Sequence, residues 1–342
     1  MNDQSSIKRC VTLFSFQEEY FLRKLNLEDC IATAARLDIP GIEIIGDQMI
    51  PGYPELSPAF IDQWHSWMDK YGRTPVCLDT FMDFNKYKSH RMSETEVLAT
   101  VIKDIQNASK LGCTLIRMNH NITPEVMQKA VPSAERSGIR LALEIHAPHH
   151  LDHEFEQRHL EMMQRTQSPY LGFMVDLSIF TSRFPRVISE RWVRNGMNPS
   201  IASYFVANYN AHNDLDYVCD EAVRMGARPE DIGMIYYGCT RNIYTDPRKM
   251  FDYMPWIFHI HANFNEMLSD GTEFSTPYDE IIPVLQQGGF KGYHSSEYEG
   301  NKHIEDAYEV DSVEQVRRHQ VMLKRYLAVE QYEKVEMIAR FH

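Results

Sequence analysis

A carboxylate and an imidazole lie two residues apart in the otherwise apolar stretch LALEIHAPHH, residues 141–150. Alternate side chains of an extended strand point to the same face, so we expect Glu144 and His146 to face one space together. The apolar side chains between and before them then face the other way. A carboxylate beside an imidazole can bind a metal ion or move a proton, so the stretch predicts either a solvated face or a site that performs chemistry.

Three later apolar runs also carry polar residues near their carboxyl ends. These residues are Asp176 in FMVDLS, His259, His261 and Asn263 in FHIHAN, and Glu297 and Glu299 in SSEYEG. In each run the polar residues occupy one alternate set of positions and the apolar residues the other. Any one of them alone is explained by a buried polar group that its neighbours satisfy, but four runs together favour a shared site.

Several buried carboxylates that face one space repel each other, and each raises the pKa of the others unless a cation lies among them. A divalent metal held by Glu144, Asp176, Glu297 and a histidine of FHIHAN resolves this conflict. Carboxylate oxygens with one imidazole favour Mn²⁺ or Mg²⁺, while Zn²⁺, Co²⁺ and Fe²⁺ remain open.

The elements that position these residues follow an alternation of strand-like runs and amphipathic helical stretches along the 342 residues, which is typical of a parallel sheet. Eight strands are expected, beginning at Val11, Gly41, Thr74, Thr114, Arg140, Tyr170, Trp256 and Gly292. Eight parallel strands close a (β/α)8 TIM barrel, whose active sites lie at the carboxyl ends of the strands. In this interpretation the polar residues of the lumen belong to the last four strands alone.

Helix boundaries support the same plan. SETE, from Ser93, predicts a capping box, and TPEVM, from Thr123, puts proline at the first helical position. The segment from about 179 to 255 is too long for a simple connection and predicts a helical insertion after strand six, on the active-site face. We expect one barrel domain over 1–342, with a last helix over about 311–333 that packs on the barrel.

Composition limits the partners. The formal net charge is −13, which argues against a nucleic-acid backbone as the main partner, and no apolar run is long enough to span a membrane. The first residues show no secretory signal, so a cytoplasmic location is expected. The six cysteines form no CxxC pair and are interpreted as buried thiols. His149 and His153 in HHLDHEFE lack the HExxH order of zinc proteases, so we interpret this stretch as a polar loop beyond strand five.

With Glu, Asp, His and Glu on its last four strands, the sequence resembles the xylose isomerase-like barrel superfamily of sugar isomerases, epimerases and lyases over nearly the whole chain. In the epimerase branch the second histidine of an HxH pair binds metal, which implies His261 and not His259. The stretches QMIPGYP from Gln48, EIHAP from Glu144, EYEG and SVEQVRRHQ resemble the large (alpha) subunits of C-glycoside deglycosidases. The long segment after strand six, and the absence of a histidine three residues after Asp176, differ from simple epimerases.

The resemblance implies metal-dependent cleavage of a 3-oxo C-glycoside. A base removes the C2 proton that the ketone acidifies, and elimination then releases an aromatic aglycone and an anhydro-keto sugar. His146 becomes the general base, or alternatively only orients a ligand or a substrate hydroxyl, while Glu144 and Glu297 are further catalytic groups. Candidate substrate contacts are His120, His259 and Asn263. The resemblance also implies a small, mainly β partner subunit in a hetero-oligomer, for which the insertion is a candidate docking or lid element.

Two other functions remain open at this point. The first is a divalent-metal-dependent isomerase or epimerase of a free keto sugar, in which Glu144 and Glu297 move a proton between neighbouring carbons. The second is a non-catalytic barrel that binds a sugar or serves as the scaffold of a complex. The same metal ligands serve the first alternative, so the ligands alone do not choose between an isomerase and a lyase.

Overall fold

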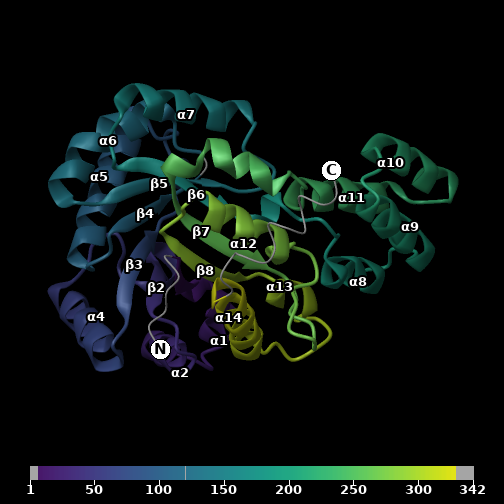
Figure 1. The fold of residues 1–342 in the computed structure, drawn as a ribbon, viewed down its shortest axis with the longest axis horizontal. Helices are drawn as coiled ribbons and strands as arrows, with labels where there is room; N and C mark the ends of the chain where they lie inside the picture. Colours follow the sequence, from purple (N-terminus) through teal and green to yellow (C-terminus); the bar gives the residue numbers. More distant parts are fainter. Residues whose placement is uncertain (1–6, 120, 329–342) are drawn as a thin grey trace.

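Eight parallel strands form a closed barrel in the computed structural model, which describes residues 7–119 and 121–328 (Figure 1). The strands are β1 (Lys8–Thr12), β2 (Gly41–Ile45), β3 (Thr74–Asp79), β4 (Leu115–Met118), β5 (Arg140–Ile145), β6 (Leu171–Asp176), β7 (Ile257–Phe264) and β8 (Tyr293–Tyr298). They follow one another in chain order, and β8 pairs with β1 to close the ring. The predicted (β/α)8 barrel is confirmed.

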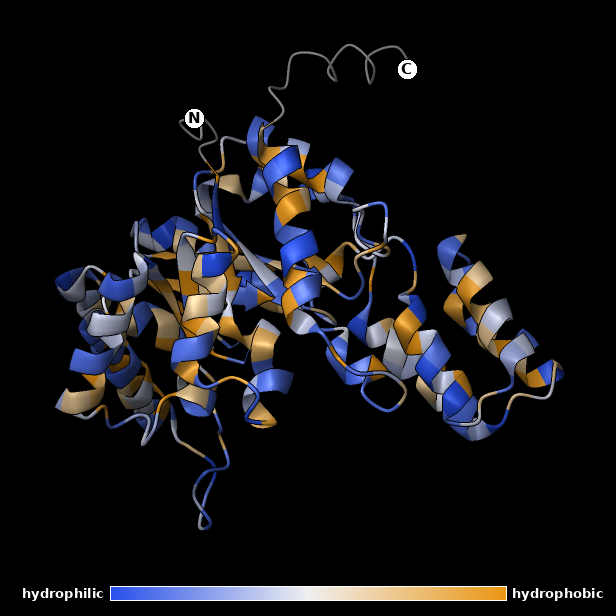
Figure 2. Ribbon diagram, turned by 90° about the horizontal axis from the view of Figure 1, so that it is seen from below, coloured by the Kyte–Doolittle hydropathy of each residue, from blue (hydrophilic) through white to orange (hydrophobic). Residues whose placement is uncertain are grey.

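Helices separate the strands and present an apolar side to them. Outside the segment between β6 and β7, these helices are α1 (Gln17–Phe21), α2 (Leu27–Arg36), α3 (Gly46–Met49), α4 (Pro58–Tyr71), α5 (Glu94–Lys110), α6 (Pro124–Ser137), α7 (Glu154–Thr166), α12 (Tyr278–Gln287), α13 (Asn301–Ile304) and α14 (Ser312–Ala328). Hydrophobic and hydrophilic residues alternate along them (Figure 2). Ser93 and Glu96 form the predicted capping box of α5, and Pro124 is the first residue of α6.

The carboxyl-terminal helix α14 packs on the barrel. Val316, Leu323 and Leu327 are buried along one side of it. The Gln320 side chain donates a hydrogen bond to the Cys10 carbonyl of β1 at 2.9 Å. The sequence predicts this helix over about 311–333, and the positions after 328 lie outside the described residues.

Four helices lie between β6 and β7 and project to one side of the barrel (Figure 1). They are α8 (Arg186–Arg194), α9 (Pro199–Asn210), α10 (Leu215–Arg224) and α11 (Pro229–Arg241). They have a hydrophobic core of their own, built around Phe184, Trp192 and Phe205. Arg194 of α8 pairs at 2.8 Å with Asp306, which follows α13 in the segment after β8. The helices are therefore attached near the carboxyl ends of the strands.

The cysteines are all free, and five of the six are buried, in agreement with the sequence interpretation. Within the described residues, no helix is both long and apolar enough to cross a membrane.

Close packing between β6 and β7 leaves no space for a side chain at Gly172. A Cβ atom there would overlap the Trp256 carbonyl oxygen and the Phe258 ring. We expect Gly172→Ala to lower the free energy of unfolding by about 1–3 kcal/mol, as overpacking does. Gly233 of α11 has open space around its Cβ position, so Gly233→Ala should instead stabilise by about 0.5–1 kcal/mol. Urea denaturation of both variants measures the two changes in the free energy of unfolding, and equal changes would contradict the prediction.

Candidate active site

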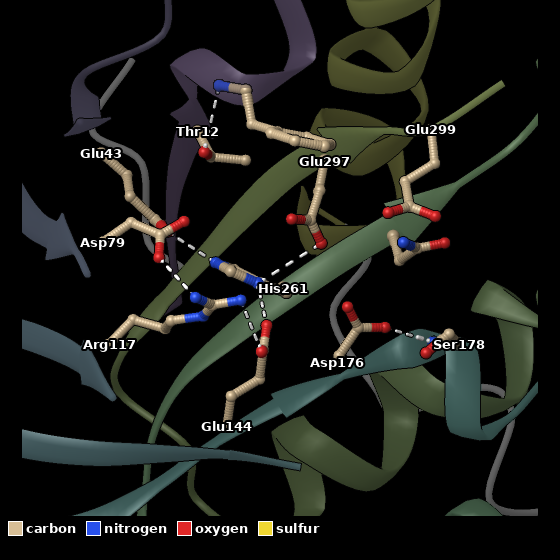
Figure 3. Close-up of polar contacts among 12 residues, drawn as sticks. Thr12, Glu43, Asp79, Arg117, Glu144, Asp176, Ser178, His261, Glu297 and Glu299 are labelled. Carbon is tan, nitrogen blue, oxygen red and sulfur yellow. Dashed lines mark hydrogen bonds and ion pairs between the residues drawn. The ribbon is translucent and has the colours of Figure 1, made fainter. Parts of the chain in front are cut away.

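The side chains of Glu144, Asp176, His261 and Glu297 converge inside the barrel from β5, β6, β7 and β8 (Figure 3). The Nδ1 atom of His261 lies 3.0 Å from Oε1 of Glu144 and 3.3 Å from Oε2 of Glu297. One ligand atom each from Glu144, Asp176 and His261 lies within 4.8 Å of the others, and Asp176 pairs with His261 in the strand register. The structure thus brings together the four residues that the sequence predicts as metal ligands.

Burial and mutual charge set the electrostatics of this cluster. Burial and the nearby carboxylates of Asp176 and Glu299 raise the pKa of Glu297 well above its usual range, although His261 opposes them. Burial acts in the same direction on Glu144, but Arg117 and His261 hold its pKa well below the usual range. The pKa of His261 is raised against the effect of burial, mainly by Glu297 and Glu43. Without a metal, the imidazolium of His261 is therefore a positive charge that Glu144 and Glu297 share, and Arg117 supplies a second one to Glu144.

Two buried carboxylate oxygens make the cluster suitable for a cation. Oδ1 of Asp176 accepts a hydrogen bond from the Ser178 backbone N–H at 2.6 Å (Figure 3), whereas Oδ2 of Asp176 has no hydrogen-bond partner among the described residues. Oε2 of Glu297 accepts no hydrogen bond among them either and has only the ion-pair contact with His261 at 3.3 Å. A buried acceptor without a partner costs about 1–3 kcal/mol. A divalent cation among the four side chains satisfies both oxygens, so these residues fit a metal ion.

Glu43 of β2 supports His261 from the opposite side. Its Oε1 accepts a hydrogen bond from Nε2–H of His261 at 2.6 Å, and its Oε2 accepts one from Nε2–H of His259 at 3.1 Å. All three side chains are fully buried. A proton held on Nε2 leaves the lone pair of His261 on Nδ1, the atom that faces Glu144 and Glu297. Carboxylates behind metal-binding histidines commonly fix the ring and its tautomer in this way.

Arg117 of β4 links two carboxylates across the lumen. Its guanidinium contacts Oδ1 of Asp79 at 2.8 Å and Oε2 of Glu144 at 2.7 Å (Figure 3). Burial raises the pKa of Asp79 to about 7, although Arg117 opposes this rise. Arg117 occupies one oxygen of Glu144 and thereby leaves Oε1 directed at His261.

The expectation that only the last four strands carry polar lumen residues is wrong. Three ionisable side chains of the early strands also lie inside the barrel. Glu43 on β2 is fully buried, and the side chains of Asp79 on β3 and Arg117 on β4 are only 9% and 17% exposed. Each interrupts a short apolar run, in GIEII, PVCLD and LIRM, so the alternation argument used for the later strands also applied to these three. These residues support the ligands from the barrel wall, because the ring closes and brings the early strands opposite the late ones.

His146 follows the last residue of β5 and is partly buried. Its Nδ1–H donates to the Ala147 carbonyl at 2.5 Å. Burial acts to raise the pKa of Glu299, but Lys302 and His146 lower it to about 2. His146 also contributes to the lowered pKa of Glu144, so it lies near both carboxylates.

The candidate substrate contacts lie in different places. Asn263 is buried beside Glu297 in the strand register, and its Nδ2 has no hydrogen-bond partner among the described residues. His259 lies two residues before His261 on β7, fully buried against Glu43, and its contact with substrate stays a prediction. His120 lies outside the described residues.

The chain matches the family model of the xylose isomerase-like TIM barrel over residues 31–324. A 3'-dehydrocarminate deglycosidase alpha subunit of a Microbacterium species is 27% identical, over 85% of this chain and 87% of its own. A C-glycoside deglycosidase alpha subunit of Microbacterium trichothecenolyticum is 29% identical, over 85% and 83%. The solved L-ribulose 3-epimerase shares the fold with a TM-score of 0.57 at 12% identity, covering 98% of this chain and 99% of its own. These matches confirm the resemblance that the sequence indicates.

The contact between Glu43 and His261 predicts a role in metal affinity. Glu43→Gln keeps the shape of the side chain but removes the charge that holds the proton on Nε2, so we expect the dissociation constant for Mn²⁺ to rise by about 10–100-fold. Calorimetric titration of the metal-free protein measures this. Glu55→Gln, at a side chain that is 78% exposed, is the control and should bind Mn²⁺ normally. An unchanged affinity in Glu43→Gln would remove Glu43 from the site.

Proposed function

This chain belongs to the xylose isomerase-like TIM barrel family, and we propose from that premise that it is the alpha subunit of an enzyme that cleaves 3-oxo C-glycosides. The observation that carries the proposal is the buried cluster of Glu144, Asp176, His261 and Glu297, with two carboxylate oxygens that accept no hydrogen bond among the described residues and His146 beside it. The relatives named deglycosidase alpha subunits support enzyme activity on a sugar conjugate. The name of one relative includes a 3'-dehydro position, which supports a 3-oxo sugar as the substrate class.

The proposed reaction begins at C2 of the sugar, where the 3-oxo group acidifies the proton. His146 takes this proton, and the electron pair moves toward the ketone. The returning electron pair forms the C1–C2 double bond as the bond from C1 to the aromatic carbon breaks. The aromatic carbon takes up a proton from solvent as it leaves, and His146 afterwards returns the C2 proton to solvent. The products are the free aglycone and an unsaturated anhydro-keto sugar.

The contacts of His146 support its role as the base. Because Nδ1–H donates to the Ala147 carbonyl, the ring carries its lone pair on Nε2, which is the atom that can accept a proton. Glu144 lies two residues before His146, near the end of β5. Asn263 is a candidate for orienting a sugar hydroxyl, since its buried Nδ2 lacks a partner among the described residues.

Glu144, Asp176, His261 and Glu297 would hold the divalent metal in this proposal. Three carboxylates and one imidazole form a hard ligand set, which favours Mn²⁺ over softer ions. When bound, the cation supplies Lewis-acid stabilisation of the negative charge that develops on the substrate. Glu43 and Arg117 keep His261 and Glu144 oriented while the charge on the substrate changes.

Product analysis tests the reaction and the base together. The protein, with Mn²⁺ and a co-expressed partner subunit, is incubated with a 3-oxo C-glucosyl flavonoid, and the released aglycone is measured by mass spectrometry. We expect His146→Ala to lower the release rate by about 10²–10⁴-fold, the usual contribution of a general base, with unchanged Mn²⁺ affinity. His65→Ala, at a histidine that is exposed on α4, should keep full activity. Full activity in His146→Ala would assign the proton transfer to another group.

The alternative function is isomerisation or epimerisation of a free keto sugar, in which Glu144 and Glu297 move the proton. The shared fold with the L-ribulose 3-epimerase is the observation that keeps this alternative in view. Conversion of a ketohexose, without release of aglycone from the glycoside, would favour it over the lyase.

We also propose that the insertion docks a small partner subunit. The relatives are named alpha subunits, which implies a second subunit in those proteins. On the insertion, Tyr217 of α10 and Tyr237 of α11 are 57% and 69% exposed, and Val223 and Met225 are also exposed. Exposed aromatic and apolar side chains are typical of an interface.

A charge placed on this surface should weaken assembly. We expect the double variant Tyr217→Glu and Tyr237→Glu to lose the co-expressed subunit in size-exclusion chromatography while keeping the Mn²⁺ affinity of the barrel. Val321→Glu, at an equally exposed position on α14, is the control. A complex that survives both tyrosine changes would move the docking surface elsewhere.

A further inference from the structure

A second group of metal-binding side chains lies outside the proposed active site, where the chain leaves β5 and enters α7. Nδ1 of His149 lies 2.7 Å from Oε1 of Glu156, and Nδ1 of His153 lies 2.9 Å from Oε2 of the same carboxylate. The two imidazole rings are stacked, with centroids 4.0 Å apart and an interplanar angle of 20°. The three ligand atoms all lie within 4.8 Å of one another.

Burial differs sharply across this group. The side chain of Glu156 is 0% exposed, whereas those of His149 and His153 are 21% and 38% exposed. The carboxylate therefore forms the buried end of the group and the imidazoles form its solvent side. An ion could reach the group from solvent without opening the barrel.

The hydrogen bonds around His153 leave a conflict that a cation resolves. His153 is the N-cap of α7, and its Nδ1 accepts a hydrogen bond from the Phe155 backbone N–H at 3.3 Å. That atom then presents a lone pair, yet it faces a carboxylate oxygen of Glu156 at 2.9 Å. Two acceptors at this distance need a proton or a metal ion between them, and a metal ion there would take the lone pair in place of the long, weak contact with the Phe155 N–H.

We propose that His149, His153 and Glu156 form a second metal site, selective for Zn²⁺. Two imidazoles and one carboxylate, with a further position open to solvent, are a common zinc ligand set. The softer nitrogen-rich set distinguishes this site from the three carboxylates and one imidazole inside the barrel. HHLDHEFE is then not only a polar loop, because the carboxylate three residues after His153 completes the group.

The site also has a structural consequence for the loop beside the barrel opening. The backbone N–H of His149 donates to the His146 carbonyl at 3.0 Å, and the N–H of His153 donates to the His150 carbonyl at 2.9 Å. A zinc ion that joins His149 to the first turn of α7 fixes both turns of this loop. It thereby positions the backbone that carries His146, without being part of the reaction.

Zinc stoichiometry tests the proposal on the full chain, with Zn²⁺ alone as the probe in equilibrium dialysis followed by metal analysis. We expect the double variant His149→Gln and His153→Gln to bind one equivalent fewer than the unaltered chain. The double variant Glu144→Gln and Asp176→Asn, altered only in the barrel cluster, should still bind this equivalent. His150→Gln is the matched control, since this neighbouring histidine is not part of the group, and it should bind as the unaltered chain does.

A more conservative variant distinguishes the loss of a metal ligand from a loss of folding. Glu156→Gln keeps the shape of the buried side chain. We expect it to weaken zinc binding at this site by more than about tenfold, because the loss of a group that only supports a metal ligand already weakens binding by about 10–100-fold. Co²⁺ binding to the barrel-altered chain gives a second readout, because a four-coordinate site absorbs strongly in visible light. Equal zinc stoichiometry in the unaltered chain and the double histidine variant would overturn the proposal, as would normal zinc affinity in Glu156→Gln. Neither result depends on whether the barrel cleaves a glycoside.

Discussion

The need to balance charge inside a closed barrel governs the rest of this structure. The buried carboxyl groups of Glu43, Asp79, Glu144, Asp176 and Glu297 face one lumen. The basic groups paired with them among the described residues are Arg117 and the histidines of β7. His261 meets these charges from both ring nitrogens, with Glu43 on one side and Glu144 and Glu297 on the other. The proposed divalent cation, held by Glu144, Asp176, His261 and Glu297, would complete the balance that the protein's own side chains leave incomplete.

The strand period arranges the lumen in layers that serve different purposes. Small and apolar side chains, including Cys10, Leu115 and Ala142, lie early in their strands. Glu43 and Arg117 follow at the third positions of β2 and β4, and Asp79 and the proposed metal ligands lie toward the carboxyl ends of their strands. His146 stands beyond the end of its strand, where a substrate could reach it. The charged groups whose burial costs the most free energy therefore lie inside the barrel, and the proposed base lies near its opening.

The loops at the carboxyl face separate this protein from other barrels with the same ligand cluster. The ligand set alone serves an isomerase as well as a lyase, because both need stabilisation of charge next to a ketone. The residues after β5 carry His146 and the proposed zinc site, and those after β6 carry the four-helix insertion. In the proposed function, specificity and assembly would therefore depend on segments that leave the barrel walls unchanged.

The sequence by itself determined the eight strands, the capping box at Ser93 and the convergence of Glu144, Asp176, His261 and Glu297. Alternation and capping are local patterns, and burial of one strand face fixes which residues point inward. Only the tertiary structure decided which charges become partners. Glu43 and His261 are 218 positions apart and meet because the ring closes. Arg117 contacts Asp79 and Glu144 because it lies on the strand between theirs. In HHLDHEFE, the spacing of the residues was visible, but the turn that stacks His149 on His153 above Glu156 was not. Partner choice depends on register, closure and turn geometry, none of which a local pattern contains.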